Sequence, residues 1–395
     1  MYKRQVITDK ELPEFKKLKK ITVNRNLSLH TLSNIKNNFQ LLSHKFQGEA
    51  QLLQIKYKNF THTIKLNLIG KIQLKNVLMA VIAANKSNLS IDKIFKAVSK
   101  IKSVEGRFER IGKLKNKSKV ILDYAHTPDA LKTCLKNLRE QFPDQKISLV
   151  FGCGGNRDQD KRSKMGMVAD LFSDKIYLTD DNPRSESPSK IRRDIKKGIQ
   201  KQKILEFSNR AEAISEAINH LKTGEILLVA GKGHETIQEQ GGKKIFFSDK
   251  INILKSIKIK NITLSNNIKI NIVKELSEEE KIPPNIILNQ ARINSKDVKK
   301  NDIFFAIKGR KNDGNKFIDE AFNKKASLAI VNKIDKNNDI KRQIKVKDPL
   351  KFLTKSSKIY RQNINTKIIA ITGSCGKTTL KELLGNSLKK MSKVS

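Results

Sequence analysis

Between Val104 and about Ser256, short apolar runs alternate with longer segments that place apolar residues three or four positions apart. The runs read KVILDYAH, KISLVFGCG, KIYLTDD and EILLVAGKG, and the segments between them include TPDALKTCLKNLREQF and KRSKMGMVADLF. The first pattern is typical of buried strands and the second of amphipathic helices. Strands that alternate with helices predict a mostly parallel sheet with helices on both faces. Residues 104–256 are therefore predicted to form one α/β domain.

Each of these four runs ends in a cluster of polar residues and glycines. The clusters are Asp123–His126, Gly152–Gly155, Asp180–Arg184 and Gly231–Glu235. Ligands of parallel α/β sheets bind beyond the carboxyl ends of the strands. We therefore expect the four clusters to meet at one edge of the sheet and to form a binding site there.

The rest of the chain divides by pattern into four further pieces. Residues 1–103 carry short strands followed by a helical pair, whereas residues 268–365 repeat an α/β rhythm in DIFFAIKG, FIDEAFNKKA and SLAIVNK. The stretch 257–267 is polar and without a clear period, which predicts a linker. Residues 366–395 read as a strand, a loop and the start of a helix.

The loop of this last piece, in IIAITGSCGKTTLKELL, has the composition of a phosphate-binding loop. Backbone N–H groups of a glycine turn and a helix N-terminus attract an anion, and a lysine adds a point charge. These considerations predict that Gly373, Gly376, Lys377, Thr378 and Thr379 bind the phosphates of a nucleotide, with the Thr378 hydroxyl on Mg²⁺. Only two residues separate the glycines, where the common P-loop has four. The alternative is a strand–turn–helix corner with a chance Gly-Lys pair.

The segment TDDNPR, after the third strand, suggests a site for an amino acid. Arg184 and Arg157 are candidate forks for carboxylates, and Asp181 and Glu235 are candidates to hold an ammonium group. A surface network of ion pairs explains the same residues equally well. His126 and His234 lie at strand ends without a third ligand at metal spacing, so no zinc site is expected.

Two further signals have plainer explanations. VFGCGGNRD begins like a dinucleotide-binding motif, but Arg157 stands where the third glycine belongs, so we reject that interpretation. The net charge of +42, from 81 basic and 39 acidic residues, is spread along the whole chain without an aromatic-interleaved stripe. It favours a compositional bias over nucleic-acid binding. It would still attract anionic substrates.

Cysteine content and hydropathy bear on the compartment. The three cysteines are odd in number and lack CxxC spacing, which fits a reducing cytoplasm. The first ten residues, MYKRQVITDK, do not resemble a signal peptide, and no run of about 18 apolar residues predicts a membrane span. We expect a cytoplasmic protein.

Together the motifs resemble the Mur ligases, the ATP-dependent amide-bond-forming enzymes of peptidoglycan synthesis. GRFERIG, DYAHTPDAL, FGCGGNRD, TDDNPRSESP and LVAGKGHE resemble, in family order, the C-terminal domain of the member that adds meso-diaminopimelate to UDP-MurNAc-L-Ala-D-Glu. LIGKIQLKNVLMAVIAA resembles the end of its central ATPase domain. The resemblance implies a Rossmann-like sheet in residues 104–256, and it implies that residues 1–103 are the end of an ATPase domain without its phosphate loop.

The resemblance also implies roles for individual residues. The residues implied for diaminopimelate are Arg157, Asp181, Asn182, Arg184, Gly231 and Glu235. The residues implied to face ATP are Asn76, Arg107, Asp123 and His126. Arg107 and Lys377 are the implied catalytic residues, and ATP and Mg²⁺ are the implied cofactors.

The third unit resembles a different member of the family. ARINSKDVKKNDIFFAIKGRKNDGNKFIDEA is similar to the N-terminal UDP-substrate domain of the ligase that adds D-Ala-D-Ala. This implies UDP-substrate contacts by Asn294, Ser295 and Lys296, where the family has Asp-Ser-Arg. ITGSCGKTT matches the short glycine spacing of Mur ligases, so residues 366–395 would start a second ATPase domain. The chain then joins the back of one ligase to the front of the next, and we expect no turnover by it alone. The alternative is a non-catalytic module that binds an amino acid or a muropeptide.

Overall fold

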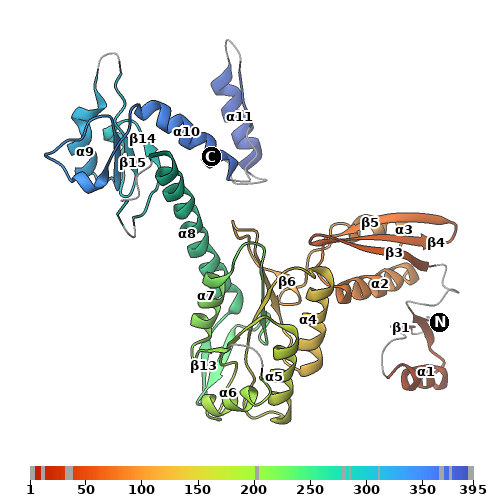
Figure 1. The fold of residues 1–395 in the computed structure, drawn as a ribbon. Coiled ribbons are helices and arrows are strands. Elements are labelled where there is room, and N and C mark those ends of the chain that lie inside the picture. The colour runs from red at the N-terminus through yellow and green to blue at the C-terminus, as the bar shows by residue number, and fades with distance from the viewer. Residues whose placement is uncertain are drawn as a thin grey trace. The chain divides into compact units, whose positions relative to one another are not determined.

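The computed structural model describes residues 5–9, 14–31, 39–200, 204–277, 282–283, 286–309, 312–363, 369–372 and 376–389 (Figure 1). The chain divides into two compact units, Met1–Ile262 and Thr263–Ser395. The structure is α/β, as predicted. Within the described ranges no helix is both long and apolar enough to cross a membrane.

The first unit begins with two small sheets. β1 (Gln5–Thr8) pairs in parallel with β2 (Ser28–Thr31), and α1 (Phe15–Asn24) connects them. An antiparallel sheet follows, made of β3 (Phe39–Gln47), β4 (Ala50–Tyr57) and β5 (Phe60–Leu66). Apolar side chains of this sheet share a core with those of α2 (Lys71–Lys86) and α3 (Ile91–Val98). The expected strands and helical pair of this region are therefore present.

The centre of the first unit is a six-stranded sheet in the order β10-β9-β8-β11-β7-β6. Its strands are β6 (Glu109–Arg110), β7 (Lys119–Asp123), β8 (Ile147–Phe151), β9 (Lys175–Leu178), β10 (Ile204–Glu206) and β11 (Ile226–Ala230). All neighbours pair in parallel except β6, which runs antiparallel to β7. The predicted mostly parallel sheet is confirmed.

Helices cover both faces of this sheet. α4 (Pro128–Gln141), α5 (Asp160–Phe172) and α6 (Pro188–Lys196) contribute to the core on one face. α7 (Arg210–His220) and the first turns of α8 (Asp249–Ser277) contribute to the core on the other. β7, β8, β9 and β11 are mostly apolar because both of their faces are buried. A hairpin of β12 (Ile237–Gln240) and β13 (Lys243–Phe246) follows β11.

The structure differs from the sequence analysis at residues 257–267, which lie inside α8 rather than in an irregular linker. No glycine or proline interrupts Asp249–Ser277, so nothing in the sequence ends the helix there. The boundary between the two compact units, after Ile262, falls inside this range. Asn261 bonds to the backbone of Lys113 and Lys115 with its side-chain amide.

The second unit contains a four-stranded parallel sheet. Its strands are β14 (Ala291–Arg292), β15 (Ile303–Phe305), β16 (Leu328–Val331) and β17 (Gln343–Lys345), in that order. α9 (Ile318–Asn323) and α10 (Pro349–Gln362) pack on it, and α11 (Lys377–Lys389) follows. Residues 369–372, expected in a strand, are not in one, since no described strand pairs with them. Asn266 in α8 bonds to the backbone of Ile286 and Leu288.

Candidate functional site

The strand order brings the four predicted clusters to one edge of the large sheet. β9, β8, β11 and β7 are consecutive neighbours and point the same way. Ala230 lies beside Asp123, and Phe151 lies beside Leu178. Because the strands end level with one another, the loops that follow them adjoin. The four clusters therefore meet at one edge of the sheet, as expected from the alternation of strands and helices. This edge, formed by the loops after β7, β8, β9 and β11, is called the rim below.

Arg184 lies on this rim, in the turn after β9. Its backbone is in the left-handed region, with a φ of 55°. Its Nη1 donates to the carbonyl of Gly155 at 2.8 Å, and its Nε lies 3.0 Å from the carboxylate of Glu239 in β12. Gly155 in turn donates its N–H to the carbonyl of Asn182 at 2.9 Å. The loops after β8 and β9 are thus joined through the guanidinium of Arg184.

Asn182 and Glu235 are joined by a buried lysine. The side chain of Lys232 has no exposed surface, and its Nζ donates to Oδ1 of Asn182 at 3.0 Å and to Oε2 of Glu235 at 3.2 Å. It also donates to the carbonyl of Ile237 at 2.7 Å. Nδ2 of Asn182 lies 3.3 Å from the same Glu235 oxygen. The sequence analysis assigned no role to Lys232, because lysine is rarely buried.

Asp181 is almost fully buried, like its neighbours Asp180 and Asn182. Burial raises the pKa of its carboxyl, while Arg210 and then Lys232 oppose that rise. A Cβ atom on Gly231 would lie 2.6 Å from Oδ2 of Asp181, and the φ of Gly231 is +119°. Only glycine fits at this position, because both the space and the backbone conformation exclude a side chain.

Arg210 links α7 to the end of β11 and to the start of α8. It is buried and forms a two-pronged ion pair with Asp249, each contact 2.8 Å long. Its Nη2 also donates to the carbonyl of Ala230, the last residue of β11, at 2.9 Å. Neither Arg210 nor Asp249 was predicted, since nothing in their spacing distinguishes them from surface charges.

The residues expected to face ATP occupy a neighbouring part of the first unit. Both oxygens of Asp123 accept backbone N–H groups at 2.8 Å, from Phe108 and Ala125, so this carboxylate fixes the loop. The guanidinium of Arg107 lies over the ring of Tyr124, 4.5 Å from its centre. His126 is exposed, and its Nδ1 lies 3.0 Å from the carbonyl of Tyr124. Asp123, Arg107 and His126 therefore lie near one another, around Tyr124.

Other predicted residues are more loosely placed. Asn76 is exposed on α2. Arg157 is exposed on the loop after β8, two residues after Gly155, whose carbonyl accepts a hydrogen bond from Arg184. Gly373 lies outside the described residues. Gly376 has a φ of +75°, and α11 begins at Lys377, so Thr378 and Thr379 stand in its first turn. Among the described residues, a glycine with a positive φ therefore directly precedes the helix.

In the second unit, Asn294, Ser295 and Lys296 lie at the start of a short 3₁₀ turn. The side chain of Asn294 accepts the N–H of Lys296 at 3.1 Å. The hydroxyl of Ser295 is buried and donates to Glu320 at 2.6 Å. Of the three, Asn294 and Lys296 are exposed.

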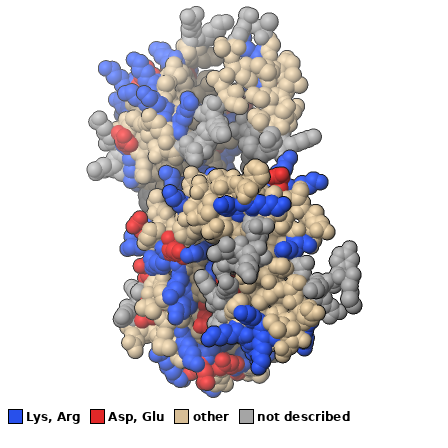
Figure 2. Space-filling view, turned by 90° about the vertical axis from the view of Figure 1, so that its right-hand side faces the viewer, with Lys and Arg blue, Asp and Glu red and all other residues tan. Residues whose placement is uncertain are grey.

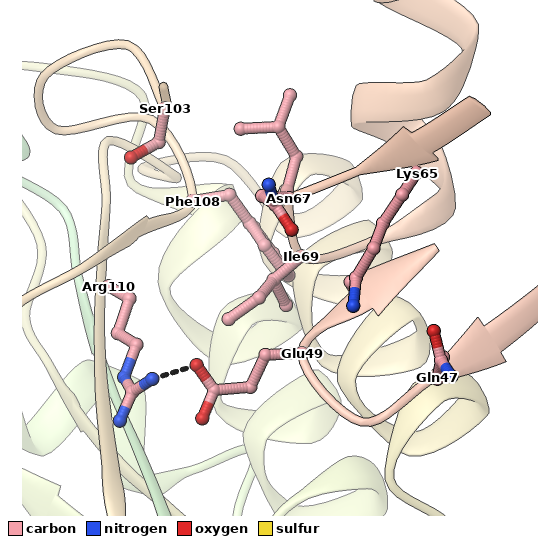
Figure 3. A pocket seen from close by; sticks show the side chains of 10 residues that line it. Gln47, Glu49, Lys65, Asn67, Ile69, Ser103, Phe108 and Arg110 are labelled. Atoms are coloured by element: carbon pink, nitrogen blue, oxygen red, sulfur yellow. Dashed lines mark hydrogen bonds and ion pairs between the residues drawn. The ribbon is translucent and has the colours of Figure 1, made fainter. Parts of the chain in front are cut away.

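A separate cavity of about 420 Å³ lies in the first unit between the β3–β5 sheet and the loop before β6 (Figure 3). It is bordered by an ion pair between Arg110 and Glu49. Burial lowers the pKa of Arg110. None of the predicted site residues lines this cavity.

Basic side chains do not gather in one stripe on the face drawn in Figure 2. Lys and Arg residues are spread over that face, with Asp and Glu residues among them. This distribution matches the scatter of lysines along the sequence.

Part of the first unit, including most of the rim, matches the model of a known protein family. Residues 106–233 match the family model described as "Mur ligase, glutamate ligase domain". This segment is therefore similar to the glutamate ligase domain of Mur ligases. It contains β6 to β11 and the residues Asn182, Arg184 and Lys232, whose partners Glu235, Ile237 and Glu239 follow it in the sequence. The α/β fold and the mostly parallel sheet therefore agree with the family to which the resemblance pointed.

Curated relatives match a longer part of the chain than this segment. A UDP-N-acetylmuramoyl-L-alanyl-D-glutamate--2,6-diaminopimelate ligase of Rickettsia rickettsii is 39% identical over 254 residues, which are 64% of this chain and 52% of the relative. The ligase of that name from Fusobacterium nucleatum is 44% identical over 199 residues, 50% of this chain and 41% of the relative. The chain spans about half the length of the curated relatives it matches.

A solved structure of a UDP-N-acetylmuramoyl-L-alanyl-D-glutamate--2,6-diaminopimelate ligase is also similar to this chain. The match covers 65% of this chain and 53% of the chain in that structure, with 27% sequence identity and a TM-score of 0.49.

Proposed function

We propose that the rim of the first unit holds meso-diaminopimelate for an ATP-dependent Mur ligase that adds it to UDP-MurNAc-L-Ala-D-Glu. The observation that carries this proposal is the joining of Asp181, Asn182, Arg184 and Glu235 at one edge of the sheet. The first three lie within the segment 106–233 that matches the family model, and Glu235 follows it by two residues. Relatives at 38 to 44% identity bear the name of that ligase. The protein would work in the cytoplasm, where its nucleotide substrates are made.

The roles of the rim residues follow from their chemistry. Arg184 would bind the distal carboxylate of the amino acid, because guanidinium is the side chain best suited to a two-pronged carboxylate contact. Glu235 and Asp181 would attract the distal ammonium. Gly231 would leave room for the ligand, and Arg157 would add a second cation. Such contacts hold the other amine of the ligand in place for attack, which is catalysis by positioning.

The second unit would bind ATP and Mg²⁺ through a phosphate loop. In the second unit the left-handed Gly376 and the first turn of α11 fit the backbone that cradles a phosphate. Lys377 would contact the outer phosphates, and the hydroxyl of Thr378 would contact Mg²⁺, which neutralises charge during phosphoryl transfer. We propose that Arg107, stacked on Tyr124, and Asp123, His126 and Asn76 form the face that the first unit presents to ATP.

The second unit would belong to another ligase. We propose that residues 268–365 bind the UDP end of a muramyl-peptide substrate, near Asn294 and Lys296, and that residues 366–395 begin its ATPase domain. A titration of the chain with UDP, in which Lys296→Ala weakens binding and Lys336→Ala does not, would support this assignment. Equal binding by both variants would contradict it.

Isothermal titration calorimetry tests the proposal for the first unit. The chain should bind meso-diaminopimelate more tightly than L-lysine, which lacks the second carboxylate. Arg184→Lys should weaken meso-diaminopimelate binding by about 10- to 100-fold, because a charged hydrogen bond contributes about 1.5–3 kcal/mol. The exposed Arg193→Lys is the matched control. Equal affinity for the two amino acids would contradict the proposal.

A second measurement separates a ligase from a binding module. We propose that the chain by itself releases no ADP when it is given ATP, Mg²⁺, meso-diaminopimelate and the UDP-linked dipeptide. Binding without turnover is expected of the chain alone. Sustained ADP release that depends on both substrates would show that the chain is catalytically complete.

A further inference from the structure

The guanidinium of Arg184 already has a carboxylate partner within the chain. Nε of Arg184 lies 3.0 Å from Oε2 of Glu239, the third residue of β12. This glutamate was not part of the predicted site. An amino acid that offers a carboxylate to Arg184 meets a group of the same charge and chemistry already in place.

The backbone fixes Glu239 in that position. Its N–H donates to Oδ1 of Asn182 at 3.1 Å, and its carbonyl accepts the N–H of Arg184 at 3.0 Å. The carbonyl of Arg184 accepts the N–H of Gly241 at 2.7 Å. The hairpin is therefore bonded along its edge to the same turn that carries the two proposed ligand-binding side chains. Glu239 is held beside Arg184 whether or not its carboxylate contacts the guanidinium.

The side chain itself is less tightly held than the backbone. The side chain of Glu239 is 34% exposed and the side chain of Arg184 is 28% exposed, so water can reach this ion pair and replace it. Pairs as exposed as this one contribute little to stability. A second cation, Lys244 of β13, lies 3.9 Å from the other oxygen of Glu239. A cavity of about 320 Å³ lined by Arg184, Glu239, Lys243 and Lys244 adjoins the pair.

We propose that Glu239 is a specificity-determining internal carboxylate, which competes with the ligand's distal carboxylate for Arg184 and turns to Lys244 when the ligand binds. The inference rests on the proposed function. Because the contact is exposed, displacing it costs about a fivefold loss of affinity or less. Lysine lacks the second carboxylate and does not need to displace Glu239. The glutamate therefore narrows the difference in affinity between the two amino acids.

The first test reads the availability of Arg184 without an amino acid. The chain is treated with phenylglyoxal, and modification of Arg184 is followed by peptide mass spectrometry. Glu239→Gln should increase the rate of modification, because the amide pairs more weakly with guanidinium than the carboxylate does. Glu212→Gln, the same change on the exposed side of α7, is the control. An unchanged rate in Glu239→Gln would overturn the inference.

The second test reads selectivity. Calorimetry with meso-diaminopimelate and L-lysine should show that Glu239→Gln raises the ratio of their affinities by about two- to fivefold. Lys244→Met should lower this ratio, since the displaced carboxylate loses its second partner, and should have no effect in the Glu239→Gln background. A ratio that falls in Glu239→Gln would show that Glu239 orients Arg184 for the ligand and would overturn competition.

The two tests also separate the inference from the function on which it rests. If neither amino acid binds the wild-type chain or Glu239→Gln, the proposed function fails, whatever the phenylglyoxal result. If meso-diaminopimelate is preferred and both measurements are insensitive to Glu239, the proposed function stands and the inference fails.

Discussion

Nζ of Lys232 lies 3.0 Å from Oδ1 of Asn182, with the lysine side chain fully buried. An ammonium can only donate, and the N–H of Glu239 donates to the same oxygen, so the amide of Asn182 has one possible orientation. Its NH₂ group must face Glu235 and the rim. Lys232 thereby decides that Asn182 presents hydrogen-bond donors, which suit a carboxylate.

Replacing Lys232 by methionine should disturb both stability and binding. The substitution keeps the length of the side chain but leaves the Ile237 carbonyl and the Asn182 oxygen without this donor. We expect a loss of about 1–3 kcal/mol in the free energy of unfolding. We also expect weaker binding of meso-diaminopimelate. Urea denaturation and calorimetry measure the two effects. Lys243→Met, on the exposed strand β13, should change stability by less than about 0.5 kcal/mol.

Removing both charges of the buried pair Arg210 and Asp249 should destabilise the protein by less than the sum of the two single losses. Arg210→Met leaves an uncompensated buried carboxylate and should reduce the free energy of unfolding by about 3–5 kcal/mol. The double variant Arg210→Met with Asp249→Leu should lose less than the sum of the two single variants. Chemical denaturation of all four proteins completes the cycle. Additive losses would mean that the ion pair contributes no coupling energy.

Gly231→Ala should cost more than a glycine-to-alanine change elsewhere in the first unit. The new Cβ would lie 2.6 Å from Asp181, and the backbone would have to keep a φ of +119°. Gly224 also has a positive φ, +80°, but open space around it. Gly224→Ala therefore measures the backbone strain alone, of order 1 kcal/mol. Thermal denaturation should show a larger loss for Gly231→Ala. Equal losses would mean that Asp181 moves aside freely.

Stability should fall in acid partly through Glu186. The backbone N–H of Asn156 and then the guanidinium of Arg162 lower the pKa of this carboxyl below its ordinary value of 4.5. A lowered pKa in the folded state means that the stabilisation is complete above that ordinary value and is lost as pH falls through the lowered one. Arg162 is fully buried and pairs with Glu186 at 2.9 Å.

The pH dependence of unfolding checks this assignment. Glu186→Gln should be less stable than wild type at neutral pH by about 1–2 kcal/mol and should lose less on acidification. Urea denaturation from pH 7 to about pH 3 supplies the comparison, with Glu212→Gln as a control of equal charge change. Parallel curves for wild type and Glu186→Gln would show that other carboxyls govern the acid transition.

The sheet and its rim were predictable because their signals are local. Runs such as Ile226–Ala230 are apolar throughout, and helices such as α4 begin with a proline after a capping threonine, Thr127. Lys232 and Glu239 were not predictable, because their roles depend on burial and on a hairpin that folds back on the turn after β9. The helix through residues 257–267 was missed because its polar residues show no clear helical period, although the segment contains no glycine or proline that would end a helix.

α8 supplies apolar side chains to two separate cores. Ile253 and Ile257 pack in the first unit, and Val273 packs in the second. Asn261 and Asn266 each anchor the helix to an extended segment of their own unit. To separate the two units without removing either contact, a protease must cut, or a truncation must end, within the helix between Asn261 and Asn266. A cut on either side of that interval would strip one unit of a side chain that holds its backbone together.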